Sequence, residues 1–275
     1  MKIKRPKVIN AYIPQVIKEE SDALISRYWG KPSLPSGYQW PVKMRDEYLD
    51  IYNKTENKKI KYYPGLFYAQ FLVSDLPEEV KKLLPCDAGM ILIFTRYFTI
   101  NVIVLSKNEL TTCIPTEMPQ QYKQYIYDDM MNIEHQVESY VLKQFILRKE
   151  WQSPYSEDEI DNMDDNTYKE IIKKYNILYN LNNIDFPTNL IYRTNNDLPP
   201  HESINTVYAE DKFLGADFFE NNDRDEVPVS YRKLFQITGS GPLGYNNKIN
   251  NNYFYGTGNI FINKKYKIKS FASCD

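Results

Sequence analysis

The chain has 275 residues, of which 42% are hydrophobic and 25% charged, a balance typical of a globular protein with one large domain or two fused halves. Its formal net charge of −2 provides no overall field that would favour nucleic acid. No stretch approaches the ~18 apolar residues of a membrane-spanning helix. Composition therefore predicts neither nucleic acid nor a membrane as a partner.

The first part of the chain is predicted to contain one helix, a loop and three strands. Residues 15–28 carry apolar side chains among charges, a pattern that indicates an amphipathic helix. The prolines and glycines of residues 28–41 predict an ordered loop that covers the core. β-Branched and aromatic residues then predict strands at 66–73, 90–96 and 100–105.

The middle of the chain has a different pattern. Residues 136–150 are rich in apolar and aromatic side chains and are interpreted as a strand. Thr167 and Glu170 have the spacing of a capping box, which predicts that a helix begins there and continues to about Leu181.

A short pattern occurs twice in the chain. Each copy is an apolar run with one Gln, then a loop, then an apolar run that begins near a Gly. Gln70 and Gln236 are 166 positions apart, and Gly89 and Gly258 are 169 apart. Such similar offsets predict a duplicated unit in which Gln70 matches Gln236 and Gly89 matches Gly258.

The predicted fold class is α+β, because short strands occur in two runs with few helices between them. Two pseudo-repeated antiparallel-sheet subdomains are expected to pack together, with a helical and strand insertion between them. The whole chain, residues 1–275, is expected to form a single globular unit. Within it, the first repeat covers 25–105, the middle insertion 106–205 and the second repeat 210–275.

Four segments of the first half resemble the bacterial YwqG-like family. Residues 29–35 read Trp-Gly-Lys-Pro-Ser-Leu-Pro and residues 40–41 read Trp-Pro. Residues 69–71 read Ala-Gln-Phe, and residues 88–94 read Ala-Gly-Met-Ile-Leu-Ile-Phe. The family has a Gly-x-Pro-x-Leu-Pro loop ending in Trp-Pro, a strand with Ala-Gln-Ile, and a Gly-x-Leu-x-Phe-Phe strand.

The second half is similar to the same family at residues 234–238, 255–261 and 273–275. It departs from the family pattern where Tyr255 replaces Trp and where Thr257 replaces an Asp-Ala pair. The resemblance implies a cytoplasmic α+β protein, and some relatives are encoded beside secreted polymorphic toxins. It carries over no catalytic residues.

Residues 239–244 match the GxGxxG pattern of dinucleotide-binding loops. The Asn-rich sequence after them is a poor helix, so we interpret the segment as a flexible hairpin loop. The two histidines, His135 and His201, lie in no catalytic or zinc-binding motif. The sequence therefore predicts no catalytic residue, no metal site and no cofactor.

Three cysteines occur in the chain, at Cys86, Cys113 and Cys274. Their number is odd and none has CxxC spacing, which argues against a disulfide framework. The basic residues at the N-terminus are not followed by the apolar segment of a signal peptide. We therefore expect three free thiols and a cytoplasmic location.

Two acidic segments are the candidate binding surface. Residues 217–226 combine acids with two aromatic side chains, and residues 157–165 are almost entirely polar or acidic. Such charge accelerates the docking of a basic partner, whereas the alternative interpretation is a solvated loop. The predicted binding residues are Asp217, Phe218, Phe219, Glu220, Asp223, Asp225, Glu226, Glu157, Asp158 and Asp161.

These observations favour a non-enzymatic, protein-binding function. The leading hypothesis is an immunity protein that neutralises a cognate bacterial polymorphic toxin with a basic surface. The alternative is a small-molecule-binding protein or an enzyme that uses a cleft between the two repeats, near Gln70 and Gln236. A structural hydrogen bond inside a sheet is the simpler role for these two glutamines.

Overall fold

The structure is a computed structural model of residues 1–275. It describes residues 7–44, 54, 62–96, 99–122, 138–152, 162–179, 211–215, 227–238, 242 and 257–273. The first strands in chain order are β1 (Lys7–Lys18), β2 (Arg27–Tyr28), β3 (Ser33–Pro35), β4 (Val42–Met44), β5 (Tyr62–Pro64), β6 (Leu66–Leu72) and β7 (Ala88–Arg96). The remaining strands are β8 (Thr99–Ser106), β9 (Cys113–Pro115), β10 (Tyr140–Gln152), β11 (Lys212–Leu214), β12 (Tyr231–Thr238), β13 (Thr257–Asn263) and β14 (Ile268–Ser273).

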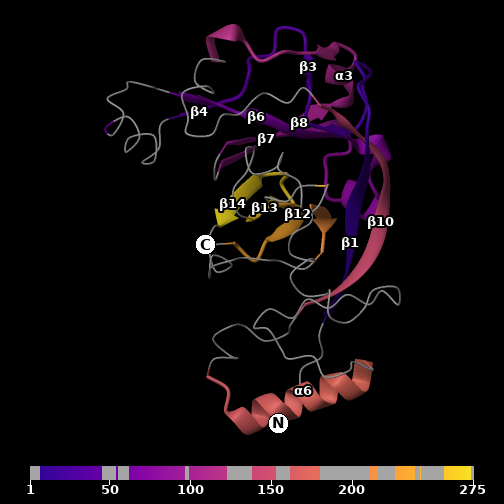
Figure 1. Cartoon of the computed structure of the whole chain (residues 1–275), viewed down its shortest axis with the longest axis vertical. Helices are drawn as coiled ribbons and strands as arrows, with labels where there is room; N and C mark the ends of the chain where they lie inside the picture. Colours follow the sequence, from indigo (N-terminus) through magenta and orange to yellow (C-terminus); the bar gives the residue numbers. More distant parts are fainter. Residues whose placement is uncertain are drawn as a thin grey trace.

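The described helices are few and mostly short. They are η1 (Val73–Asp75), α2 (Glu78–Lys81), α3 (Lys107–Leu110) and α6 (Asp165–Tyr179). In Figure 1, α6 lies at the opposite end of the molecule from β3 and β4. None of the helices in the described ranges is long and apolar enough to cross a membrane.

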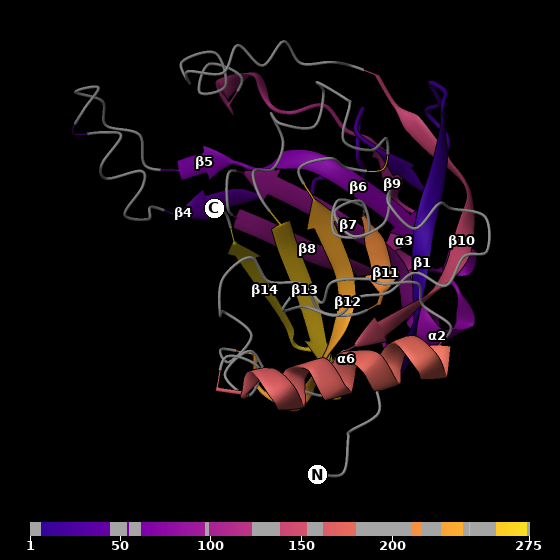
Figure 2. The same cartoon turned by 60° about the horizontal axis from the view of Figure 1, so that its bottom comes forward.

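Ten strands form one antiparallel sheet in the order β14-β13-β12-β11-β1-β10-β2-β6-β7-β8. The sheet curls until its two edge strands meet, and the hydroxyl of Ser270 in β14 donates a hydrogen bond to the carbonyl oxygen of Ile100 in β8 at 3.0 Å. Figure 2 shows the result: β12, β13 and β14 run across β6, β7 and β8, while β1 and β10 join the two groups at one side. The sheet is therefore nearly closed and barrel-like.

The predicted α+β fold class is wrong, because the protein is mostly β. The two predicted subdomains are instead two halves of one continuous sheet. The strand interpreted as part of a middle insertion exists as β10, but it pairs with β1 along its whole length and so forms the centre of the sheet. Long-range pairing of this kind joins segments that sequence patterns treat separately.

The two halves have the same strand order outward from β1 and β10. Arg27 pairs with Gln70 on one side, and Lys212 pairs with Gln236 on the other. Each half also has a register shift just before its Gln. Gln70 and Gln236 therefore hold corresponding positions.

The glycines of the two halves do not correspond. Gln70 pairs with Leu92 and Gln236 pairs with Asn259, so Leu92 and Asn259 are equivalent. The residue before each is Ile91 in the first half and Gly258 in the second, so the expected match of Gly89 with Gly258 is wrong.

A second correspondence follows the short strands β2 and β11. Trp29 and Gly30 both have positive φ, at 54° and 71°, and so do Leu214 and Gly215, at 58° and 78°. Two consecutive left-handed residues are rare because a β-carbon crowds the backbone there. Each half therefore leaves its short strand through the same unusual backbone turn, a feature that the sequence pattern did not reveal.

Local predictions are confirmed for most strands and for one helix. The strands expected at 66–73, 90–96 and 100–105 are β6, β7 and β8. The predicted helix exists as α6, but it begins at Asp165 with Asp164 accepting hydrogen bonds from the N–H groups of Asn166 and Thr167, so the capping box at Thr167 is wrong. The helix expected at 15–28 is wrong, because its first residues continue β1.

Pro14 is tolerated in β1 because β11 pairs with β1 only at Ala11 and Tyr12. Beyond Tyr12, β1 has no ladder hydrogen bonds to β11. Proline has no backbone N–H, and on this side of β1 none is needed. The same strand remains fully paired with β10 on its other side.

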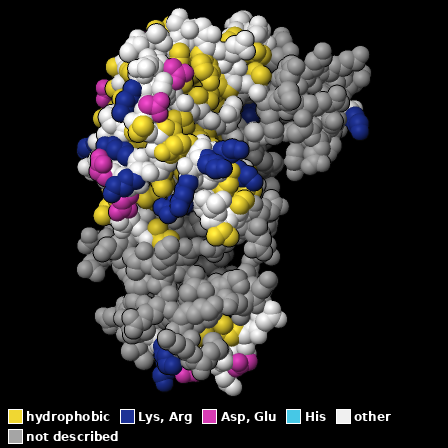
Figure 3. Space-filling model, turned by 180° about the vertical axis from the view of Figure 1, so that it is seen from behind, with side chains coloured by type: hydrophobic (Ala, Val, Ile, Leu, Met, Phe, Trp, Pro, Cys, Tyr) yellow, Lys and Arg dark blue, Asp and Glu magenta, His cyan; other side chains and the backbone are white. Residues whose placement is uncertain are grey.

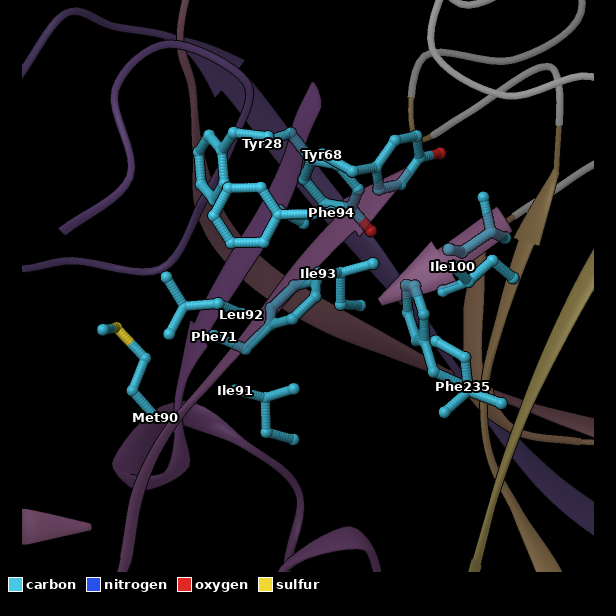
Figure 4. Packing of buried hydrophobic residues seen from close by; sticks show 14 of the residues in the cluster. Tyr28, Tyr68, Phe71, Met90, Ile91, Leu92, Ile93, Phe94, Ile100 and Phe235 are labelled. Atoms are coloured by element: carbon cyan, nitrogen blue, oxygen red, sulfur yellow. The ribbon is translucent and has the colours of Figure 1, made fainter. Parts of the chain in front are cut away.

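Aromatic side chains fill the space between the two halves. Phe71 of β6 lies 4.9 Å from Phe213 of β11 and 5.4 Å from Phe235 of β12, measured between ring centroids. All three are at most 1% exposed. Figure 4 shows Phe71, Tyr28 and Tyr68 from one half directed toward the same space as Phe235 from the other. Each such ring contributes roughly 1.5–3 kcal/mol by burial, so this contact holds the halves together.

Candidate functional site

All ten predicted binding residues, in segments 157–165 and 217–226, lie outside the described residues. The same is true of His135 and His201, and of the GxGxxG segment except for Pro242. The structure therefore does not test the predicted acidic surface.

The thiols of Cys86 and Cys113 are free, and Cys274 lies outside the described ranges. Burial and the nearby carboxylate of Glu109 raise the pKa of the Cys113 thiol. A smaller fraction of this thiol is therefore present as the reactive thiolate at neutral pH. In the described part of the chain, no three His, Cys, Asp or Glu side chains come close enough to hold a metal ion.

Gln70 is a structural residue of the first half. Its Oε1 accepts a hydrogen bond from the backbone N–H of Ser33 at 2.7 Å, and its Nε2 donates to the carbonyl oxygen of Ile25 at 2.7 Å. The side chain is fully buried. Gln70 therefore fixes the chain just before β2 and at the start of β3, and both polar atoms of its side chain are occupied within the fold.

Gln236 holds the corresponding position in the second half and has a different neighbour. Its Oε1 accepts a hydrogen bond from Lys233 Nζ at 2.7 Å, and Gln236 is fully buried. Beside it, Lys212 Nζ donates to both carboxylate oxygens of Glu150 at 2.9 Å. Lys212 and Glu150 are 0% and 1% exposed. A buried pair of this kind depends on keeping both partners, because either charge alone would be strongly destabilising.

A buried polar cluster links the two halves inside the sheet. The hydroxyl of Tyr68 in β6 donates to Asp211 Oδ2 at 2.7 Å. The backbone N–H of Thr238 in β12 donates to Asp211 Oδ1 at 2.9 Å, and the Thr238 hydroxyl lies 3.3 Å from the same oxygen. Asp211 therefore joins residues that are 170 positions apart in the chain.

Burial raises the pKa of Asp211 to about 7, although the hydrogen bonds from Tyr68 and Thr238 act in the opposite direction. Burial, together with the charge of Asp211, raises the pKa values of Tyr28 and Tyr68 well above the usual tyrosine range. A carboxyl group that titrates near neutral pH is chemically suited to move protons. Asp211, Tyr28 and Tyr68 are each 0% exposed, however, so this group is shielded from a dissolved substrate.

A pocket of about 260 Å³ lies where β7 and β8 approach β4. Phe94 and Ile100 form apolar walls, and Thr95, Arg96 and Asn101 add polar groups. Arg96 is only 4% exposed. An apolar pocket with a few convergent polar groups is the usual form of a small-molecule site.

The turn between β13 and β14 carries a cluster of positive charges. Lys264, Lys265 and Lys267 are exposed in the turn, Lys269 is exposed in β14, and Arg232 is exposed in the neighbouring strand β12. Arg232 pairs with Ile262, two residues before the turn. We call these five cations and Tyr266 the basic hairpin.

None of the five cations of the basic hairpin forms an ion pair with any residue in the described ranges. Figure 3 shows that Lys and Arg side chains also gather near the middle of one face of the molecule. The basic hairpin was not predicted from the sequence, because the net charge of −2 for the whole chain does not reveal a local cluster of lysines. Four lysines within residues 264–269 were the available signal.

Comparison with known proteins adds no assignment. No family model matches the chain, and no curated protein matches it either. The resemblance to the YwqG-like family therefore stays a prediction from the motifs, and the function must be argued from the residues themselves.

Proposed function

We propose that this is a non-enzymatic binding protein that acts through its outer surface, in the form of a cytoplasmic immunity protein that neutralises a bacterial polymorphic toxin. The observation that supports this proposal is the filled space between the two halves. Phe71, Phe213 and Phe235 occupy the place where a cleft between repeats would lie. Packing of this kind occupies the space in which a ligand between the repeats would lie, which favours binding at the outer surface.

The two glutamines support the same proposal. A site in a cleft between the repeats was expected near Gln70 and Gln236, but both are fully buried and hydrogen-bonded within their own halves. Neither is available to a ligand without first breaking these contacts. This removes the residues on which the cleft hypothesis depended.

The proposed partner is a toxin with a basic surface that docks on the acidic segments. Residues 217–226 supply Asp217, Glu220, Asp223, Asp225 and Glu226, with Phe218 and Phe219 as candidate anchors. Aromatic side chains are enriched at the centre of protein interfaces, where they act as anchors. Opposite charges on the two partners would accelerate their encounter, and salt would slow it.

The test is complex formation and neutralisation with the product of an adjacent toxin gene. We expect Asp223→Lys, Asp225→Lys and Glu226→Lys, combined in one variant, to slow association roughly tenfold or more at low salt and to reduce its salt dependence. The matched control is the triple variant Glu19→Lys, Glu20→Lys and Asp87→Lys, which changes net charge equally at other exposed positions.

Equal slowing by the control variant would show that only net charge matters and would remove 217–226 from the interface. Absence of any complex with the adjacent gene products would contradict the immunity function itself.

A second candidate function is the binding of a small anion, favoured by the pocket beside Arg96. The guanidinium is permanently charged and suits a carboxylate or phosphate. All lining residues in the described ranges come from the first half, so this pocket differs from a cleft between repeats. Thermal stabilisation by inorganic phosphate or succinate that disappears in Arg96→Lys would support it.

A further inference from the structure

The turn of the basic hairpin is tightly constructed. Asn263 Oδ1 accepts hydrogen bonds from the backbone N–H groups of Lys265, at 2.8 Å, and Lys267, at 3.0 Å. The backbones of Asn263 and Lys267 pair at 3.1 Å, and the N–H of Tyr266 donates to the Asn263 carbonyl oxygen at 2.9 Å. The turn therefore fixes the backbone from which its lysines and Tyr266 project.

Tyr266 occupies a backbone position that suits glycine or asparagine. It is the last of the three residues between the backbone-paired Asn263 and Lys267, and its φ is +59°. Three-residue hairpin loops normally end in such a left-handed residue, where Gly is favoured because a side chain strains the backbone. A bulky aromatic residue there is an outlier. Tyr266 is 50% exposed, so much of the residue remains accessible to a partner.

The surroundings of Tyr266 are positive. Three lysines share its turn, and Lys269 and Arg232 lie on the adjoining strands. The ammonium of Lys269 lies 5.6 Å from the centre of the Tyr231 ring, so a second aromatic ring supports the cluster. The basic hairpin thus joins a half-exposed ring, held at a cost in backbone strain, to the three lysines of its turn and to Lys269, whereas Arg232 lies on the opposite face of the sheet from Lys269.

We propose that the basic hairpin binds single-stranded nucleic acid, with phosphates on its lysines and one base stacked on Tyr266. Single-strand sites combine a cationic track for the backbone with aromatic rings on which bases stack. This function goes beyond the toxin-binding proposal and does not depend on it. It also revises the expectation, drawn from the net charge of −2, that nucleic acid is not a partner. A local cluster of lysines can attract phosphates although the whole chain is nearly neutral.

The exposed ring distinguishes this partner from two others. An acidic protein segment would use the lysines but has no general need for a flat face at the tip. An anionic membrane would favour apolar side chains beside the ring, whereas the residues that flank Tyr266 within its turn are exposed lysines. A nucleobase uses both the ring and the charges.

The first experiment measures binding of a fluorescein-labelled (dT)20 oligonucleotide by anisotropy between 50 and 200 mM NaCl. If four lysines contact phosphates, affinity should fall roughly 50-fold across this range, following a slope of about −0.7 for each contact. Changing Lys264, Lys265, Lys267 and Lys269 to Gln should abolish most binding and flatten the slope.

The matched control changes Lys82, Lys143, Lys169 and Lys173 to Gln, which removes the same charge from exposed positions elsewhere. Equal loss of affinity in both variants would overturn the proposal. Competition by polyglutamate as effective as unlabelled (dT)20, or tighter sedimentation with phosphatidylserine-containing vesicles than binding to (dT)20, would overturn it in favour of the other partners.

The second experiment separates binding from folding at Tyr266. Tyr266→Asn keeps a residue that accepts the left-handed backbone, so its melting temperature should equal or exceed that of the wild type. Its affinity for (dT)20 should nevertheless fall roughly 5- to 150-fold, and Tyr266→Phe should restore it. Unchanged affinity in Tyr266→Asn would eliminate the stacking role, and tighter binding of duplex than of (dT)20 would contradict the single-strand assignment.

Discussion

In each half of the sheet, a buried cation pairs across strands with a glutamine: Arg27 with Gln70 and Lys212 with Gln236. The two cations have different hydrogen-bond partners. In the first half, Arg27 donates to the carbonyl oxygens of Ser21 and Ala23 and to the hydroxyl of Ser33 at 3.1 Å. In the second half, Lys212 relies on the carboxylate of Glu150. The same backbone therefore supports two solutions to the problem of burying a positive charge.

This difference shows how much each half depends on single residues. A guanidinium spreads its charge over several neutral acceptors, so losing one acceptor leaves others. Burial lowers the pKa of Arg27 but leaves an arginine charged at physiological pH. The ammonium of Lys212, by contrast, depends on the single carboxylate of Glu150, so losing that carboxylate leaves the charge unpaired. The second half should therefore be the more sensitive to single substitutions.

The largest effect is expected when the ion pair of the second half is broken. Glu150→Gln leaves the Lys212 charge buried without a carboxylate and should lower the free energy of unfolding by about 3–5 kcal/mol. Its first-half counterpart, Ser33→Ala, removes one neutral acceptor and should cost about 1 kcal/mol. Urea unfolding of both variants measures the comparison, and equal losses would contradict it.

The double variant Glu150→Met with Lys212→Met provides the control. Replacing both charges with apolar side chains of similar length should recover most of the stability lost in Glu150→Gln. Failure to recover it would mean that packing around Glu150, rather than the unpaired charge, carries the effect.

Asp211, which joins the two halves through Tyr68 and Thr238, should make the free energy of unfolding depend on pH. The pKa of Asp211 is raised from 3.8 to about 7, so between these values the folded protein keeps a proton that the unfolded chain releases. This contribution is complete below pH 4 and is lost as pH rises to 7, by at most about 1.4 kcal/mol per pH unit. Thermal unfolding at pH 5 and 7.5 should show lower stability at the higher pH.

Asp211→Asn should remove this part of the pH dependence, because an amide does not titrate. Tyr68→Phe should shift the transition to higher pH, because the Tyr68 hydrogen bond lowers the pKa of Asp211. An unchanged pH profile in Asp211→Asn would assign the dependence to other groups.

Smaller effects are expected from alanine at the left-handed glycines. Gly37, Gly30 and Gly215 have φ of 78°, 71° and 78°, so backbone strain is nearly equal in all three. A β-carbon at Gly37 meets nothing within 4 Å, one at Gly30 lies 3.0 Å from the Ser139 β-carbon, and one at Gly215 lies 2.7 Å from Glu150 Oε2.

Gly37→Ala should cost about 1 kcal/mol from strain alone, Gly30→Ala more, and Gly215→Ala about 2–3 kcal/mol because it also disturbs the ion pair. Denaturant midpoints rank the three variants. A loss for Gly37→Ala as large as that for Gly215→Ala would show that the turn, and not the neighbouring charge, sets the sensitivity of the second half.

The sequence by itself determined most individual elements. β-Branched and aromatic residues predicted β6, β7 and β8, and the sequence also predicted the existence of α6, although the helix begins at Asp165 rather than at the expected capping pair. These signals are local, because the preferences of neighbouring residues produce them. The equivalence of Gln70 and Gln236 was also predicted from the sequence, because each lies in an apolar run followed by a loop and a second apolar run.

Only the tertiary structure decided which segments pair and which charges are shared. The helix expected at 15–28 is wrong because residues 15–18 continue β1 and pair with β10, where Gln15 lies opposite Gln144, 129 positions away. The partners of Lys212 and Asp211 are likewise distant in sequence, at Glu150 and Tyr68. Burial favours a polar group only when its partner is present, and no local pattern specifies a partner more than 60 residues away.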